Sequence, residues 1–185
     1  MKLVILDRDG VINQDSVNFI KSPNEWIPIA GSLEAITLLS QSGFRVVVAT
    51  NQSGVSRGLF DMVTLNNIHD KMHREVAQIG GRIDAIFYCP HSAEEHCHCR
   101  KPKTGMIEEI GKRFSVDLNQ VPAVGDALRD LQAYANAGCR PILVLTGKGE
   151  ATLAAAEHAE TALPANTWIC ADLSEAVQRI IAEYA

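Results

Sequence analysis

Short apolar runs alternate with helix-like stretches along most of this sequence, and the alternation limits what the chain can fold into. An apolar run of this kind predicts a buried strand, and apolar residues at helical spacing predict the helix that returns the chain to the next strand. Repeated strand–helix pairs indicate a parallel sheet with helices on both faces. The predicted pairs are 3–6 with 33–39, 46–49 with 65–76, 86–88 with 106–114, 123–124 with 128–137 and 142–145 with 151–162, before a last helix at about 174–184.

The length of 185 residues suits one domain of this doubly wound, Rossmann-like α/β class. We therefore expect a single domain over residues 1–185. Local signals support the first two helices: Ser32 can cap the first and Gly43 can end it, while Thr64 can cap the second. The Ala-rich stretch 151–162 is expected to be a solvent-facing helix rather than a linker.

Charge and cysteine content narrow the class of partner. With 22 acidic and 17 basic side chains the net charge is −5, the wrong sign for a protein that binds mainly nucleic acid or an anionic membrane. No apolar run approaches the length of about 18 residues that a membrane span needs. Five cysteines, three of them within residues 89–99, favour metal binding in a reducing compartment over disulfides. We expect a cytoplasmic monomer with a small-molecule partner.

Carboxylates follow two of the predicted strands. Asp7 and Asp9 come directly after the first strand, and Asp126 follows the fourth. Ligands of open parallel sheets bind beyond the carboxyl ends of the strands, where these side chains would meet. Any one of them alone would be read as a turn or cap residue. Together they require a shared proton or a hard cation such as Mg²⁺.

Four motifs in order along the chain resemble those of the haloacid dehalogenase (HAD) superfamily. They are Asp7-x-Asp9, Thr50-Asn51, a lysine within 100–103, and Gly125-Asp126-x-x-x-Asp130. Within that superfamily, the finer strings at 7–13, 50–54, 57–58, 89–91, 99–102 and 105–106 resemble the D-glycero-D-manno-heptose 1,7-bisphosphate phosphatases. The histidinol-phosphate phosphatases share most of these strings and remain the alternative.

The resemblance implies a phosphatase that works through a phosphoaspartate. Asp7 would attack phosphorus, and Asp9 would protonate the leaving oxygen and later activate water. Thr50 and a lysine would hold the oxygens of the transferred group. Two lysines compete for that role, and we favour Lys101 over Lys103 because it follows the last cysteine and an arginine, as in the family.

The resemblance also implies the metal ligands of the phosphate site. Mg²⁺ would be bound by the carboxylates of Asp7 and Asp126 and by the backbone carbonyl of Asp9. Asp130 would not bind the metal itself but would orient a water molecule that does.

A cysteine–histidine cluster predicts a second metal. Cys89, His91, Cys97 and Cys99 offer three thiolates and one imidazole, the ligands of a closed tetrahedral zinc site. We expect a structural zinc in the loop 89–99 that holds the following Arg100 and Lys101 at the phosphate site. His96 and His98 are chemically possible ligands, but we expect them to be bystanders.

Two intervals leave no room for a cap domain. About 22 residues separate Asp9 from Ser32 and about 50 separate Thr50 from Lys101, so substrate choice falls to loops. Arg57 and Arg100 could bind a second phosphate. Many heptose enzymes have a lysine where this chain has Ala127. The other expected substrate-binding residues are Asp15, Ser16, Val17, Asn18, Asn51, Gln52 and Ser53.

The implied reaction is removal of the C7 phosphate from the heptose bisphosphate, a step toward ADP-heptose and lipopolysaccharide core.

Two non-enzymatic readings are weaker. A phospho-receiver domain would need an aspartate where Cys89 stands, and a zinc interaction module would not need both Asp7 and Asp9. His69 and His73 are expected to be solvated helix residues, and the glycines around Lys148 lack the spacing of a P-loop.

Overall fold

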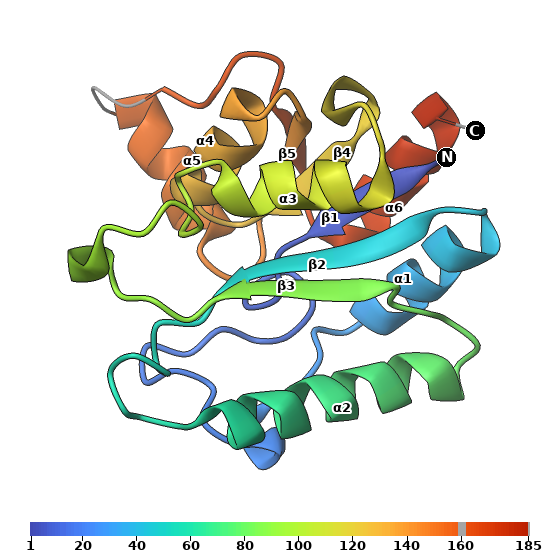
Figure 1. Ribbon diagram of the computed structural model, residues 1–185. Coiled ribbons are helices and arrows are strands. Elements are labelled where there is room, and N and C mark those ends of the chain that lie inside the picture. Colours follow the sequence, from blue (N-terminus) through green and yellow to red (C-terminus); the bar gives the residue numbers. More distant parts are fainter. Residues whose placement is uncertain (159–161, 185) are drawn as a thin grey trace.

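The structure, a computed structural model, describes residues 1–158 and 162–184 around a six-stranded parallel sheet (Figure 1). The strand order is β3-β2-β1-β4-β5-β6, so the direction of winding reverses between β1 and β4. This confirms the predicted doubly wound class. The strands are β1 (Leu3–Leu6), β2 (Arg45–Asn51), β3 (Ala85–Cys89), β4 (Pro122–Gly125), β5 (Arg140–Val144) and β6 (Trp168–Cys170).

Helices cover both faces of the sheet. Side chains of α1, α2 and α6 pack in one hydrophobic cluster and those of α3 and α4 in the other, and Figure 1 shows α2 and α3 on opposite sides of the sheet. The helices are α1 (Ser32–Gln41), α2 (Met62–Gln78), α3 (Gly105–Phe114), α4 (Leu128–Asn136), α5 (Gly149–His158) and α6 (Leu173–Tyr184); the short 3-10 helices are η1 (Pro23–Glu25), η2 (Ala93–Glu95) and η3 (Leu118–Gln120).

The central strand β1 is buried on both sides, which explains its continuous apolar sequence. Val4 and Leu6 belong to the cluster of α1, α2 and α6, whereas Leu3 and Ile5 belong to the cluster of α3 and α4. A strand covered on both faces has no polar side to alternate with. The first polar residue after β1 therefore marks the point where the chain leaves the core.

The helix ends differ from two of the expectations. Gly31, with φ of 84°, precedes α1, and Ser32 is the first residue of the helix rather than its cap. The side chain of Asp61 caps α2 by accepting the backbone N–H of Thr64, so Thr64 is not the cap. Gly43, also at φ of 84°, ends α1 as expected.

Two other elements differ from the predicted ones. Strand β6 was not predicted, because its three residues at the edge of the sheet give too short a pattern. The helix expected at 151–162 begins at Gly149 and is seen as far as His158; residues 159–161 lie outside the described part of the chain, and Ala162 is not helical. Its described side chains are mainly exposed or half-buried, as expected for a solvent-facing helix.

The two intervals measured in the sequence contain no inserted domain. Residues 8–31, all of them described, hold only η1, and residues 52–100 hold α2, β3 and η2. As predicted, neither interval holds a cap domain. Among the helices that the structure describes, none combines the length and the apolar character that a membrane crossing requires.

Candidate active site

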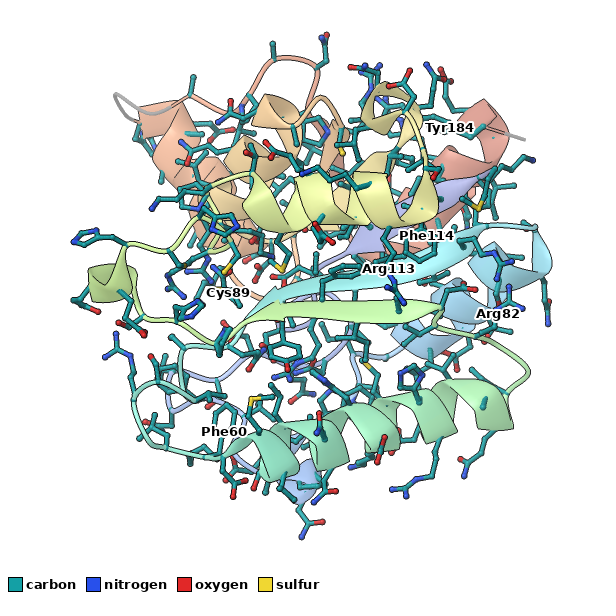
Figure 2. The ribbon with its side chains drawn as sticks, in the orientation of Figure 1. Phe60, Arg82, Cys89, Arg113, Phe114 and Tyr184 are labelled. Atoms are coloured by element: carbon teal, nitrogen blue, oxygen red, sulfur yellow. The ribbon has the colours of Figure 1, made fainter. Side chains whose placement is uncertain are left out.

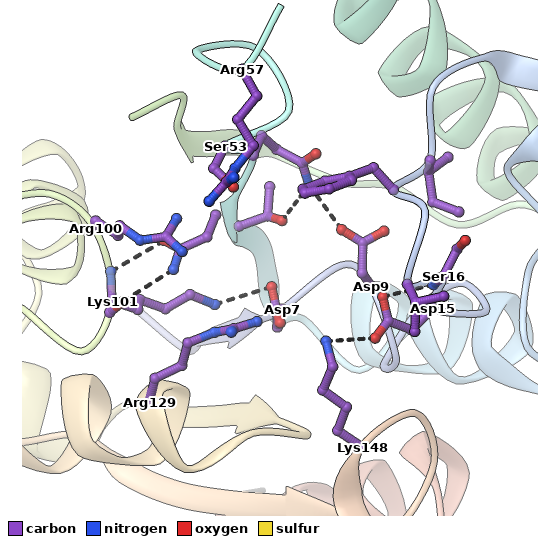
Figure 3. Close-up of a pocket in the computed structure, with 16 residues that line it drawn as sticks. Asp7, Asp9, Asp15, Ser16, Ser53, Arg57, Arg100, Lys101, Arg129 and Lys148 are labelled. Atoms are coloured by element: carbon purple, nitrogen blue, oxygen red, sulfur yellow. Dashed lines mark hydrogen bonds and ion pairs between the residues drawn. The ribbon is translucent and has the colours of Figure 1, made fainter. Parts of the chain in front are cut away.

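A polar cavity of about 260 Å³ opens beyond the carboxyl ends of β1 and β2 (Figure 3). The predicted catalytic residues Asp7, Asp9, Thr50 and Lys101 all line it. It lies beside the point where the winding of the sheet reverses, which is where such folds bind ligands. Of the residues expected to meet substrate, all but Asn18 line the cavity; they are Asp15, Ser16, Val17, Asn51, Gln52, Ser53, Arg57 and Arg100.

Asp7 and Lys101 form the buried floor of the cavity. The Lys101 ammonium nitrogen lies 3.0 Å from Asp7 Oδ1 and 2.8 Å from Asp130 Oδ1, and it donates to the Ala49 carbonyl at 2.8 Å. One ammonium thus pairs with both carboxylates. Burial lowers the pKa of Lys101, but the charges of Asp130 and Asp7 outweigh this effect and raise the pKa above its ordinary value. Lys101 therefore remains a cation.

Lys103, the competing lysine, lies outside the cavity. Its ammonium donates to the backbone carbonyls of Cys97 at 2.6 Å and His96 at 3.2 Å, and the side chain is exposed. Lys101, by contrast, is 1% exposed. The geometry therefore favours Lys101 as the phosphate-site lysine.

Three buried carboxylates converge beside the reversal of the sheet. Each of Asp7, Asp126 and Asp130 places an oxygen within 4.8 Å of the others. Burial first, and then the neighbouring carboxylates, raise the pKa of Asp7 to about 6 and that of Asp126 to about 7. Only Lys101 forms ion pairs with this group among the described residues. A divalent cation would balance the remaining charge, and oxygen ligands suit Mg²⁺.

The Asp126 carboxylate is held by two loops that lie close together in space. A Cβ at Gly10 or at Gly147 would overlap it, so both positions require glycine. Both also have positive φ, 82° for Gly10 and 58° for Gly147. The backbone N–H of Lys148 donates to Asp126 Oδ2 at 2.8 Å. The Gly147-Lys148-Gly149 loop is not a P-loop, but it contributes to the site because it contacts the Asp126 carboxylate.

Asp130 contacts more than the carboxylate cluster. Besides its ion pair with Lys101, it accepts the Ala127 backbone N–H at 3.1 Å, at the start of α4. Burial raises its pKa, but Lys101 and Arg129 outweigh this and hold the pKa below its ordinary range. Asp130 is therefore an anion that fixes Lys101.

Asp9 is surrounded by hydrogen-bond donors. Its carboxylate accepts from Arg8 through Nε and Nη2, at 2.8–3.2 Å, from Asn13 at 2.9 Å and from Gln52 at 2.9 Å. Burial raises its pKa, but Arg8 and these hydrogen bonds outweigh burial and hold the pKa below its ordinary value. The side chains by themselves thus give Asp7 the higher pKa of the two. A cation at Asp7 would lower the pKa of that group.

Thr50 presents a hydroxyl to the cavity. Gln52 Nε2 donates to Thr50 Oγ1 at 2.8 Å, so the hydroxyl hydrogen is free to point elsewhere. Asn51 joins β2 to the lysine loop, because its side chain donates to the Lys101 carbonyl and accepts the Lys101 N–H, both at 3.1 Å. The two residues at the end of β2 therefore present a donor to an anion and position Lys101.

The predicted cysteine–histidine cluster is assembled in the structure. Cys89 ends β3 (Figure 2), and its sulfur lies 3.2 Å from the Cys99 sulfur and 3.6 Å from that of Cys97. His91 Nδ1 lies 3.5 Å and 3.4 Å from the Cys89 and Cys99 sulfurs. Ligands about 2.3 Å from one zinc ion stand about 3.8 Å apart in a tetrahedron. The separations here, 3.2–3.6 Å, are somewhat shorter, and the four atoms are grouped as ligands of a single ion.

Four residues of the cavity were not predicted: Phe19, Ile20, Arg129 and Lys148. Arg129 extends from the first turn of α4, and its buried Nε has no hydrogen-bond partner in the described structure. Figure 3 shows its guanidinium pointing toward Asp7. The Lys148 ammonium forms an ion pair with Asp15 at 2.7 Å. Neither Arg129, on a helix, nor Lys148, in a loop, belongs to a recognisable sequence motif. Their position at the cavity could therefore not be predicted from the sequence.

His69 contradicts the expectation of a solvated residue. It is 6% exposed, and its Nε2 lies 3.2 Å from Nη1 of Arg8, which is itself fully buried. His73, four residues along α2, is half-buried. The prediction was wrong for His69 because a buried arginine after β1 was not foreseen.

Comparison with known proteins defines the class first. A family model described as HAD-hydrolase-like matches residues 98–176. The crystal structure of D,D-heptose 1,7-bisphosphate phosphatase from Bordetella bronchiseptica, complexed with magnesium and phosphate, superposes with a TM-score of 0.94 at 58% identity and covers 99% of both chains. The corresponding enzyme from Burkholderia thailandensis gives a TM-score of 0.77 at 48% identity, over 98% of this chain and 99% of that one. The fold and site are those of a HAD-like hydrolase.

The sequence relatives define the family. The D-glycero-beta-D-manno-heptose-1,7-bisphosphate 7-phosphatase of Bordetella bronchiseptica is 58% identical over 99% of both chains. That of Neisseria meningitidis serogroup A is 51% identical over all of this chain and 97% of its own. This chain belongs to the D-glycero-beta-D-manno-heptose-1,7-bisphosphate 7-phosphatase family.

Proposed function

We propose that this protein hydrolyses the C7 phosphate ester of D-glycero-beta-D-manno-heptose 1,7-bisphosphate. The observation that carries the proposal is the buried Asp7–Lys101 pair beside Asp126 at the floor of the cavity, in a chain 58% identical to a phosphatase of that name. The β anomer follows the names of the relatives. The product would enter synthesis of ADP-heptose for the lipopolysaccharide core.

The reaction proceeds in two displacements. An Asp7 oxygen attacks the C7 phosphorus, the bond between phosphorus and the sugar oxygen breaks, and Asp9 supplies the proton that the sugar oxygen takes up. Water then attacks the phosphoaspartate, Asp9 accepts its proton, and phosphate leaves with Asp7 restored. Asp9 is protonated at the start and at the end of this cycle, and the donors around it favour the carboxylate form that exists between the two displacements.

Thr50 and Lys101 stabilise the transferred group. The free hydroxyl hydrogen of Thr50 donates to a phosphoryl oxygen. The Lys101 ammonium, already beside Asp7, neutralises charge that develops on the same group. Asp130 supports this role because its ion pair with Lys101 holds the ammonium in place.

Mg²⁺ is the cation that we propose for the carboxylate cluster. Asp7 and Asp126 would supply side-chain oxygens and Asp9 its backbone carbonyl, with Asp130 orienting a metal-bound water. The Bordetella enzyme was crystallised with magnesium and phosphate, which supports this choice. When bound, the ion would neutralise charge on the phosphoryl group.

Zinc is the metal that we propose for Cys89, His91, Cys97 and Cys99. Three thiolates and a neutral imidazole around a dication give a net charge of −1 and leave no open position, so its role is structural. Burial raises the pKa of the Cys89 thiol, and a metal would be needed to hold it as the thiolate. The closed loop then presents Arg100 and Lys101 to the cavity.

The cations of the rim favour a bisphosphate. Arg57, Arg100, Arg129 and Lys148 all line the cavity, and Arg100 is anchored to the zinc loop by donating to the His91 carbonyl at 3.2 Å. A second phosphate gains from these charges, whereas the ammonium of histidinol phosphate does not. Asp15, Ser16 and Val17 would meet sugar hydroxyls.

A parallel assay of phosphate release from the heptose bisphosphate and from histidinol phosphate tests the proposal. We expect a higher kcat/KM for the heptose, and identification of the product as the 1-phosphate. A higher kcat/KM for histidinol phosphate would instead assign the chain to that alternative activity. We further propose that the enzyme acts as a cytoplasmic monomer of one domain, with no nucleic-acid or membrane partner.

A further inference from the structure

We propose that His69 is a positioning residue that acts through Arg8 to fix the carboxylate of Asp9. This inference rests on the proposed function, in which Asp9 transfers protons. Neither His69 nor Arg8 lines the cavity. Any effect that they have on turnover must therefore pass through the group that they hold.

Arg8 is the link between the two residues. It is fully buried, and its guanidinium donates to Asp9 Oδ1 from Nε at 3.2 Å and from Nη2 at 2.8 Å, while Nη2 also lies 3.1 Å from Oδ2. This fork fixes both the distance and the plane of the carboxylate. The remaining nitrogen, Nη1, points to His69 Nε2 at 3.2 Å.

The contact defines the state of the histidine. A guanidinium nitrogen can only donate, so His69 Nε2 must present its lone pair and the ring proton must be on Nδ1. A protonated ring would place a second cation against a buried arginine. Burial first, and then the charge of Arg8, lower the pKa of His69 to about 3, so the ring remains a neutral acceptor at neutral pH.

The helix makes this acceptor rigid. His69 lies on α2 beside Ile68 and near Met72, both fully buried in the core, and its ring stands 6.2 Å from that of Tyr88 on β3. The acceptor is therefore placed by the packing of a long helix against the sheet. Without it, a buried arginine donor would lose its partner, and the guanidinium would turn to recover one. Asp9 would turn with it.

The decisive experiment compares two substitutions at one position. His69→Leu removes the acceptor, whereas His69→Gln keeps an amide oxygen that can accept from Arg8. We expect His69→Leu to lower kcat by between about tenfold and a hundredfold with KM for the bisphosphate nearly unchanged, and His69→Gln to restore most of kcat. Equal kcat values for the two variants, or a wild-type kcat for His69→Leu, would overturn the proposal.

A control separates positioning from general loss of packing. Met72→Ala removes a buried side chain from the same face of α2 but leaves the His69 acceptor in place, and should lower the melting temperature while leaving kcat of the folded protein near wild type. If His69→Leu does not fold, Arg8→Lys gives the same test, because an ammonium keeps the charge but loses the fork. We expect the same fall in kcat, and a wild-type kcat for Arg8→Lys would overturn the proposal.

Asp9→Asn distinguishes failure of this inference from failure of the proposed function. If Asp9→Asn turns over like wild type, the proton-transfer role of Asp9 is wrong and His69 has nothing to position. If Asp9→Asn is inactive while His69→Leu is fully active, only the role of His69 is wrong. If both lose kcat and His69→Gln recovers it, both proposals stand.

Discussion

The side chains of Asp7 and Lys101 meet at 3.0 Å in the buried floor of the cavity, although one follows the first strand and the other follows the cysteine–histidine loop 89–99. Both side chains are almost fully buried, so the opposite charge of each one stabilises the other. The pairing joins the carboxylate that we propose as the attacking group to the cation that we propose for the transferred phosphate.

Asp7→Asn should reduce phosphate release by more than about a thousandfold, because the amide cannot form the phosphoaspartate. The loss of stability should be small, since Lys101 keeps Asp130 as its counter-ion and burial beside Asp126 and Asp130 already raises the pKa of Asp7 to about 6. Steady-state assay and thermal unfolding measure both effects. Asp70→Asn, an exposed change on α2, is the control. Substantial activity in a verified Asp7→Asn preparation would end the phosphoaspartate mechanism.

Lys101→Met should lose both activity and stability. It leaves Asp7 and Asp130 without their shared cation, and removing one partner of a buried ion pair costs about 3–5 kcal/mol. Lys103→Met is the matched control, since Lys103 is exposed and its ammonium donates to backbone carbonyls of the loop 89–99. Urea unfolding and phosphate release are the measurements. Similar losses in both variants would show that the phosphate-site lysine was wrongly assigned.

One zinc ion per chain should survive an EDTA wash that strips magnesium and reversibly abolishes activity. Cys99→Ser should lower zinc content, melting temperature and turnover together, because the loop carries Lys101. Cys139→Ser, which changes a buried cysteine outside the cluster, should keep its zinc. Elemental analysis is the measurement, and protein prepared without chelators yet free of zinc would refute the assignment.

Arg100→Ala should lower kcat/KM for the heptose bisphosphate more than for a sugar monophosphate. A charge-assisted contact to the second phosphate is worth about 1.5–3 kcal/mol, and this difference between substrates isolates it. Arg113→Ala, near the end of α3 and away from the cavity, is the control. Equal losses on both substrates would place Arg100 at the reacting phosphate instead.

His69 should make stability depend on pH. Its pKa is about 3 in the folded protein against 6.5 for an ordinary histidine, so the unfolded chain binds the proton and the folded chain does not. Protonation of His69 therefore leaves the free energy of unfolding unchanged well above pH 6.5. Below that value the free energy of unfolding falls with decreasing pH, by up to about 1.4 kcal/mol per pH unit. Urea unfolding between pH 5 and 7.5 should give wild type a steeper loss than His69→Gln. Parallel curves would contradict the assignment.

Most of the residues that line the cavity were identified from the sequence, because they stand in recognisable strings at the ends of strands. Asp7, Thr50 and Asp126 follow directly from the strand pattern, and the cysteine cluster from local spacing. Arg129 and Lys148 were missed because they reach the cavity through the packing of α4 and of the loop after β5. That packing leaves no local pattern.

The parts of the fold that have strong local sequence patterns were predicted, and the parts that lack such patterns were not. Strongly apolar runs gave five strands, whereas β6 was too short to detect. His69 stands next to Ile68 on the apolar side of α2, so its burial follows from helical periodicity, but its partner Arg8 follows a strand and was not expected inside the core. Polar contacts inside a core depend on two distant positions at once, which one sequence does not show.

The position of Asp126 beneath Gly10 and the backbone N–H of Lys148 has a consequence for the order in which the chain matures during synthesis. The ligands of the cysteine cluster span residues 89–99, so that loop can close as soon as it leaves the ribosome. The carboxylate cluster needs Asp7 from the first strand together with residues up to 148. On the proposed metal assignments, a nascent chain would be able to take up zinc once residue 99 has emerged, whereas the magnesium and phosphate site would need residue 148 as well.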